Sequence, residues 1–124
     1  MPLAAGTRGL IGADDIGRMK RSAYLVNTSR GPIVDEAALI AALAAGRIGG
    51  AGLDVYDDEP LPTDHPFRSL PNVLATPHIG YVTRQNYEIY LTETVENILA
   101  FIEGRPIRVI DEHTKRQRGG LPVP

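Results

Sequence analysis

The sequence of 124 residues contains no cysteine, which excludes a disulfide framework, a thiolate zinc site and a cysteine nucleophile. Residues 1–12 carry no apolar core of signal-peptide length, and no segment approaches the roughly 20 apolar residues of a membrane span. The formal net charge of −2 gives no electrostatic case for binding nucleic acid or an anionic membrane. With 43% hydrophobic and 23% charged residues the composition is globular, and we expect a cytoplasmic protein.

Apolar runs that alternate with helical patterns predict an α/β fold with parallel strands. Asp35 is a suitable cap for the middle helix and Gly46 a suitable stop, because Asp favours helix starts and Gly favours helix ends. A strand, a helix of about a dozen residues and a second strand form a right-handed parallel unit. We expect strands over 23–27, 48–55 and 73–76, and helices over 13–21, 35–45 and 83–104.

The segments between and after these elements are expected to be irregular. Residues 57–72 contain four prolines, which argue against any regular structure and predict a long surface loop. The long helix has an apolar face, which is more typical of packing than of a cofactor site. That face comprises Tyr87, Tyr90, Leu91, Thr94, Ile98 and Phe101. Residues 107–110 are expected to be extended, and residues 111–124 to form a flexible tail.

Three polar residues follow the predicted strands, namely Arg30, Glu59 and His78. The carboxyl ends of parallel strands meet at one edge of a sheet, so these side chains are expected near one another. A guanidinium suits bidentate binding of a substrate carboxylate, and an imidazole can move a proton near neutral pH. An adjacent carboxylate orients the imidazole and favours its protonated form. The set predicts acid/base chemistry on an anionic substrate.

Each of these residues also has a purely structural interpretation. Arg30 could be an exposed loop cation, Glu59 a solvated acid, and His78 a loop histidine bonded to the backbone. Asp54 could bind an amide or a sugar hydroxyl, although backbone amides are its more common partners when such an acid is buried. A metal site built from the three histidines, His65, His78 and His113, is disfavoured because their spacing matches no metal motif.

Five motifs, in this order, closely resemble the D-isomer-specific 2-hydroxyacid dehydrogenases, the family of phosphoglycerate, glycerate and D-lactate dehydrogenases. The resemblance runs from Pro2 to about Ile110. It implies half of a doubly wound, Rossmann-like parallel sheet of about three strands, with crossover helices and a long C-terminal helix. The motifs are Thr7–Ile11, Leu25–Glu36, Gly52–Val55, Glu59–Pro60 and Thr76–Gly80.

The resemblance also implies roles. Arg30 would hold the substrate carboxylate, Glu59 would pair with His78, and His78 would exchange a proton with the C2 oxygen while a hydride passes to or from NAD or NADP. The substrates implied are a 2-hydroxyacid and its 2-oxoacid. Residues implied to line the cofactor are Thr28, Ser29, Arg30, Asp54, His78 and Gly80.

One family feature is missing from the sequence, the Gly-x-Gly-x-x-Gly turn that places pyrophosphate on a helix N-terminus. We therefore expect residues 1–110 to be the C-terminal half of a truncated NAD-binding domain. One alternative is a non-catalytic remnant or a fragment that binds a partner. Another is a metal-dependent hydrolase that uses His78 and the nearby acids. The family also implies a homodimer, which this chain alone does not support.

Overall fold

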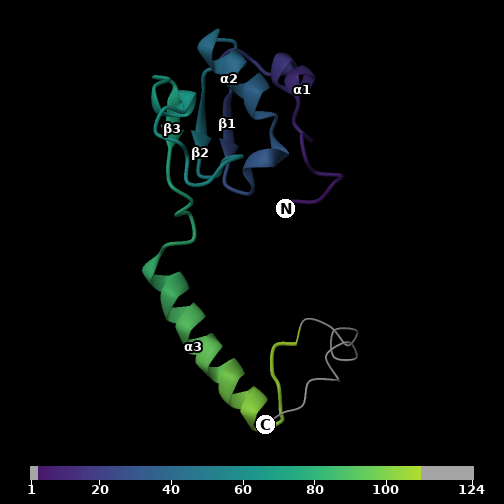
Figure 1. Cartoon of the computed structure of the whole chain (residues 1–124), viewed down its shortest axis with the longest axis vertical. Coiled ribbons are helices and arrows are strands. Elements are labelled where there is room, and N and C mark those ends of the chain that lie inside the picture. The colour runs from purple at the N-terminus through teal and green to yellow at the C-terminus, as the bar shows by residue number, and fades with distance from the viewer. Residues whose placement is uncertain (1–2, 110–124) are drawn as a thin grey trace. The chain divides into compact units, whose positions relative to one another are not determined.

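The computed structural model describes residues 3–109, which fall into two units that divide after Tyr81. The first unit contains every strand of the described chain, and the second contains one long helix (Figure 1). In chain order the elements are α1 (Ala13–Arg18), β1 (Tyr24–Asn27), the 3-10 turn η1 (Gly31–Ile33), α2 (Glu36–Ala44), β2 (Gly50–Leu53), the 3-10 turn η2 (Pro66–Arg68), β3 (Val73–Ala75) and α3 (Arg84–Ile102).

The first unit is built on a three-stranded parallel sheet in the order β1-β2-β3. Leu25 of β1 aligns with Ala51 of β2, and Ala51 aligns with Val73 of β3. The side chains in this row contribute to a core shared with the helices. The core includes Ile16, Leu39, Leu43 and Ile48. The predicted α/β class and the crossover between parallel strands are therefore confirmed.

Helix α2 begins and ends as the sequence predicts. The Asp35 carboxylate accepts a hydrogen bond of 3.0 Å from the amide of Ala38, which satisfies a donor of the first helical turn. Gly46 follows the helix with a φ of +61°, a conformation that glycine adopts without strain. These two ends fix the connection between β1 and β2.

Four predictions of local structure need correction. The first helix ends at Arg18 and not at residue 21, because the backbone is already extended at Met19. Strand β2 is shorter than residues 48–55, because it pairs with β1 and β3 only over Gly50–Leu53. The segment 57–72 is not wholly irregular, since Pro66 starts η2 and proline is well suited to a first helical turn. Of the predicted extended piece 107–110, the described residues 107–109 are not continuously extended, because Arg108 has a φ of +53°.

The described part of the second unit, residues 82–109, contains α3 with the residues that flank it. Thr83 caps α3 by accepting a hydrogen bond of 3.1 Å from the amide of Asn86. No residue of α3 is buried, and Tyr90 of the predicted apolar face is 71% exposed. No helix within residues 3–109 is both long enough and apolar enough to cross a bilayer. The predicted tail 111–124 lies outside the described residues.

Candidate active site

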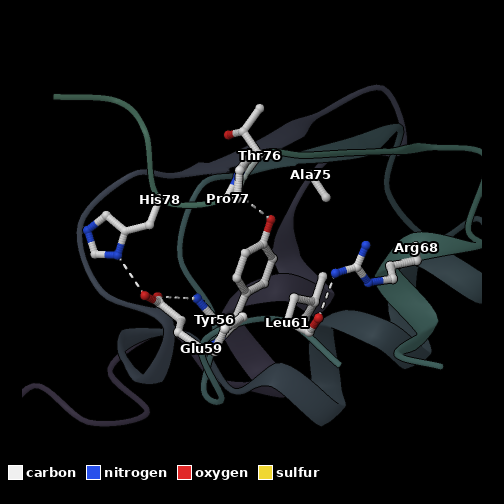
Figure 2. A pocket seen from close by; sticks show the side chains of 9 residues that line it. Tyr56, Glu59, Leu61, Arg68, Ala75, Thr76, Pro77 and His78 are labelled. Atoms are coloured by element: carbon white, nitrogen blue, oxygen red, sulfur yellow. Dashed lines mark hydrogen bonds and ion pairs between the residues drawn. The ribbon is translucent and has the colours of Figure 1, made fainter. Parts of the chain in front are cut away.

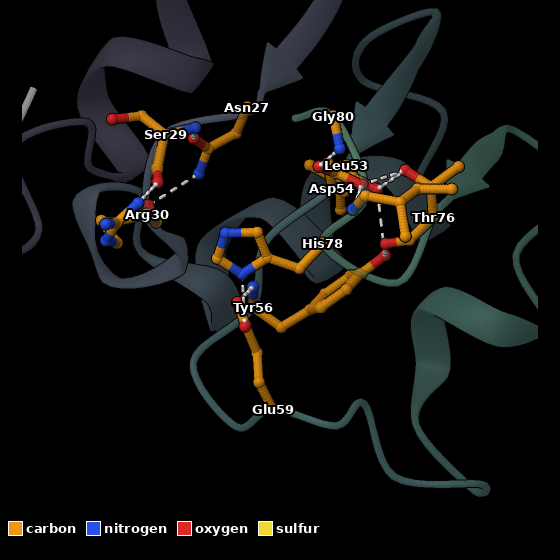
Figure 3. A network of polar contacts seen from close by, with 11 residues as sticks. Asn27, Ser29, Arg30, Leu53, Asp54, Tyr56, Glu59, Thr76, His78 and Gly80 are labelled. Carbon is orange, nitrogen blue, oxygen red and sulfur yellow. Dashed lines mark hydrogen bonds and ion pairs between the residues drawn. The ribbon is translucent and has the colours of Figure 1, made fainter. Parts of the chain in front are cut away.

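Three loops at the carboxyl ends of the strands carry the residues that the sequence singles out (Figure 3). In the first loop, the side-chain nitrogen of Asn27 donates to the carbonyl of Arg30 at 2.9 Å, and its side-chain oxygen accepts the backbone amide of Ser29 at 3.1 Å. Asn27 is buried, so it fixes the turn from which Arg30 projects. Arg30 is exposed, and its guanidinium donates to the carbonyl of Ser29 at 2.6 Å.

The first and second loops approach each other closely at Gly31. A Cβ atom on Gly31 would lie 2.0 Å from the carbonyl carbon of Tyr56. Real Cβ atoms do not approach backbone at that distance, so this position accommodates only glycine without movement. Because Gly31 has no side chain, the loop of Arg30 can pack against the segment that leads to Glu59.

Glu59 and His78 form an ion pair in which a carboxylate oxygen lies 2.6 Å from Nδ1 of the imidazole. The other carboxylate oxygen accepts the backbone amide of Tyr56 at 3.0 Å. Both side chains remain accessible, with 34% of Glu59 and 39% of His78 exposed. Because Glu59 occupies Nδ1, Nε2 is the ring nitrogen left to face a ligand.

The electrostatic surroundings keep Glu59 ionised. Partial burial alone would raise the pKa of Glu59, but the hydrogen bonds from His78 and from the Tyr56 amide outweigh that effect. The positive charges of His78 and Arg30 add to the lowering, so the pKa of Glu59 falls below its usual value. The effect of Arg30 on Glu59 is electrostatic, since no hydrogen bond or ion pair joins Arg30 to Glu59 or His78 within residues 3–109.

Asp54 organises the third loop. The residue is 5% exposed, and its carboxylate accepts three hydrogen bonds, from the Thr76 hydroxyl at 2.5 Å, the Ile79 amide at 2.9 Å and the Gly80 amide at 2.8 Å. Burial would raise the pKa of Asp54, but these bonds and the charge of His78 lower it overall. The interpretation of Asp54 as an acid satisfied by backbone amides is confirmed.

This loop holds His78 in an unusual backbone conformation. The φ of His78 is +55°, in the left-handed region that few non-glycine residues adopt. The amides of the two following residues are the ones fixed by Asp54. Asp54 therefore stabilises the turn that directs the imidazole toward Glu59.

A cavity of about 420 Å³ lies beside the ion pair. In Figure 2 the ring of Tyr56 stands between the Glu59–His78 pair on one side and Arg68 on the other. Arg68 donates to the carbonyls of Pro62 and Leu61 at 2.7 and 2.6 Å. Tyr56 and Arg68 could not be predicted as lining residues from the sequence, because neither belongs to a pattern with a chemical meaning of its own.

The remaining predicted residues divide between this region and others. Thr28 and Ser29 lie on the loop after β1, and Gly80 lies beside Asp54. His65 pairs with Glu36 at 3.1 Å, away from His78, which pairs with Glu59. His113 is outside the described residues, and residues 3–109 hold no group of three or more His, Cys, Asp or Glu arranged to bind a metal.

Comparison with known proteins identifies relatives of this arrangement. Residues 1–80 match the NAD-binding domain of the D-isomer specific 2-hydroxyacid dehydrogenases. The chain is 48% identical over 105 residues to a glyoxylate/hydroxypyruvate reductase B of Citrobacter koseri, covering 85% of this chain and 32% of that protein. It is 44% identical over 114 residues to a glycerate dehydrogenase of Methylorubrum extorquens, covering 90% of this chain and 36% of that protein.

A solved structure agrees with these sequence matches. A D-isomer specific 2-hydroxyacid dehydrogenase from Xanthobacter autotrophicus Py2, in complex with NADPH and MES, superposes with a TM-score of 0.71 at 42% identity. The match covers 87% of this chain and 44% of that one. The chain spans about a third of the length of the two curated relatives. On its fold and on the family match over residues 1–80, the chain belongs to the D-isomer specific 2-hydroxyacid dehydrogenases.

Proposed function

We propose that Arg30, Glu59 and His78 form the carboxylate-binding and proton-transfer groups of a dehydrogenase that interconverts a D-2-hydroxyacid and a 2-oxoacid. The observation that carries this proposal is the Glu59–His78 pair, which uses Nδ1 of the imidazole and leaves Nε2 for a ligand, while the charge of Arg30 helps to keep Glu59 ionised. The names of the relatives make glyoxylate and hydroxypyruvate the first 2-oxoacids to test.

In the reductive direction, Arg30 binds the substrate carboxylate through two parallel N–H donors. Protonated His78 gives the proton on Nε2 to the C2 oxygen as that oxygen gains negative charge. Glu59 stabilises the imidazolium before transfer and afterwards holds the remaining proton on Nδ1. In the oxidative direction, neutral His78 accepts the hydroxyl proton through the same nitrogen.

A nicotinamide cofactor, NAD or NADP, supplies or accepts the hydride in this reaction. Asp54 is proposed to hold its nicotinamide end, and Thr28, Ser29 and Gly80 are proposed to line the cofactor. Asp54 fits that role, because its Oδ2 accepts one bond, from Gly80, and a carboxylate oxygen can accept a second. A Cβ on Gly80 would lie 3.0 Å from this oxygen, so glycine keeps that side open.

The proposal is tested by grafting residues 3–80 into a full-length member of the family and following oxidation of NADH and NADPH with glyoxylate and hydroxypyruvate. We expect His78→Gln to lower kcat by about 10²- to 10⁴-fold, because a general acid is lost. Arg30→Lys should mainly weaken substrate binding, because lysine keeps the charge but cannot bind a carboxylate through two parallel donors.

Asp64→Asn serves as the control, since it changes one exposed charge outside the site. Turnover by His78→Gln equal to that of Asp64→Asn would remove His78 from the mechanism. The same graft without substitution must turn over for either comparison to be made, and an inactive graft with native folding would count against the proposed reaction.

A second candidate function is a non-catalytic fragment that binds a partner. The observation in its favour is the exposure of the apolar residues of α3, of which Leu91 is 65% and Ile102 is 68% exposed. Exposed apolar surface on this scale is typical of interaction sites. Cofactor-dependent turnover by the 124-residue chain on its own would exclude this candidate.

A further inference from the structure

The carboxylate of Glu36, in the first turn of α2, contacts both ends of the segment that carries Glu59. One oxygen accepts the backbone amide of Asp57 at 3.2 Å, and the other lies 3.1 Å from Nε2 of His65. The side chains are largely withdrawn from solvent, with 21% of Glu36 and 15% of His65 exposed. A single carboxylate thus closes the segment 57–65 against α2.

His65 is held on both of its ring nitrogens. The amide of Phe67 donates to Nδ1 at 3.3 Å, so Nδ1 is the acceptor and Nε2 carries the proton that faces Glu36. The imidazole also contacts the ring of Phe67, with centroids 4.9 Å apart. Phe67 is 3% exposed and belongs to the core, so the far end of the segment is tied to the interior.

Glu59 lies inside the segment closed by Glu36 and His65. Its two oxygens face the Tyr56 amide and Nδ1 of His78. Arg68 binds the carbonyls of Leu61 and Pro62 within the segment, so Glu36 is the side chain that joins its two ends to α2. Loop residues lose conformational entropy when they are ordered. Fastening the segment at both ends therefore reduces the entropy that is lost when Glu59 pairs with His78. We propose that Glu36, acting with His65, is a positioning residue that holds Glu59 against His78.

This inference rests on the proposed function of the Glu59–His78 pair. An acid in the first helical turn also has an ordinary role, because it complements the helix dipole. Asp35 already caps α2, however, and the dipole does not explain why both oxygens of Glu36 reach across to residues 57 and 65. A purely structural role would alter stability and leave the geometry of the pair unchanged in the folded protein.

The tautomer of neutral His78 separates these two roles. While Glu59 is in place, Nδ1 carries the proton, and the ratio of the two tautomers depends on that hydrogen bond. We would record ¹⁵N spectra of the imidazoles in the 124-residue chain at a pH where they are neutral. In Glu36→Gln, the Nε2–H to Nδ1–H ratio of His78 should rise about tenfold, because a hydrogen bond to a charged group is weakened.

The matched control is Asp58→Asn, which removes one negative charge from the same segment and has no hydrogen bond of its own among the described residues. It should leave the His78 tautomer unchanged. Glu36→Asp keeps the charge but is too short to reach both ends of the segment, so it should also raise the ratio. It replaces Glu36→Gln if that variant does not fold.

The inference would be overturned if both Glu36 variants fold and keep the wild-type tautomer ratio of His78. A wild-type His65 with its proton on Nδ1 would overturn it as well, because the contact with Glu36 would then lack a donor. Neither readout depends on turnover, so a failure of this inference can be told apart from a failure of the proposed reaction, which the His78→Gln graft measures.

Discussion

Helices α2 and α3 are both rich in apolar residues, yet their surroundings differ completely. Leu39 and Leu43 of α2 are each 2% exposed, whereas Leu91 and Leu99 of α3 are 65% and 55% exposed. Burial of a leucine side chain contributes roughly 1.5–3 kcal/mol, so α2 is stabilised by the core and α3 by its own backbone bonds. Isolated helices are marginally stable in water, and α3 is therefore expected to be the weaker region.

The largest expected effect is the difference in stability between truncating a leucine of α2 and truncating a leucine of α3. Leu39→Ala should lower the free energy of unfolding of residues 3–81 by about 2–5 kcal/mol, because it leaves a cavity beneath the sheet. Leu99→Ala makes the same chemical change in α3 and should alter it by less than about 0.5 kcal/mol. Urea unfolding followed by the amide resonances of β2 would measure both. Equal losses in the two variants would contradict the contrast between the helices.

Two glycines of the first unit are expected to respond in opposite ways to substitution by alanine. Gly31→Ala places a Cβ 2.0 Å from the carbonyl carbon of Tyr56, so one loop must shift, at a cost of about 1–3 kcal/mol. A Cβ added at Gly17, in α1, would have no atom within 4 Å. Alanine stabilises a helix interior by roughly 1 kcal/mol relative to glycine, so Gly17→Ala should raise stability. Thermal unfolding should therefore move in opposite directions for these two variants.

Acid should weaken the first unit through its carboxylates. The folded pKa values of Asp54 and Glu59 lie below their ordinary values of 3.8 and 4.5, so the native state binds fewer protons than the unfolded state. Their stabilisation is complete above about pH 4.5 and is lost as the pH falls through the folded values. Asp57, whose pKa is raised by burial and by Glu36, opposes them.

The measurement that isolates Asp54 is the free energy of unfolding against pH for the wild type and Asp54→Asn. The variant should be less stable at pH 6, and the difference should shrink on acidification because only the wild type loses an ionised group. A difference that stays constant with pH would mean that the Asp54 charge contributes nothing.

The smallest expected effect concerns ion pairs of the second unit. Arg108 lies 2.6 Å from Glu96 and 3.7 Å from Glu93, and its side chain is 40% exposed. Exposed pairs contribute about 0–1 kcal/mol and are screened by salt. Arg108→Gln should therefore reduce the helical circular dichroism slightly at low salt and not at all at high salt. A salt-independent loss would indicate that Arg108 stabilises α3 by packing.

Short-range chemistry made much of the first unit predictable. Asp35, Gly46 and the apolar run at 23–27 each determine structure through neighbours in the chain, and all appear where expected. The carboxyl ends of parallel strands brought Glu59 and His78 together as predicted. The contact of Gly31 with Tyr56 and the closure of the segment 57–65 by Glu36 depend on atoms distant in sequence, and no local pattern encodes them.

The exposure of the apolar residues in α3 could not be predicted from the sequence for a related reason. Helical spacing of apolar residues indicates that a face exists, but it does not say what the face contacts. Leu39 and Leu99 sit in similar sequence patterns, and only the three-dimensional structure distinguishes their 2% and 55% exposure.

The left-handed backbone at His78 also limits which residues can replace it. At a φ of +55°, valine or isoleucine would be strained, whereas asparagine and aspartate adopt this region several-fold more often than other side chains. Asparagine in place of His78 would therefore leave the backbone of this loop largely unstrained. The imidazole of His78 also bonds Glu59 and lowers the pKa of that carboxyl, so His78→Asn should keep the turn but lose the stabilisation that this hydrogen bond contributes.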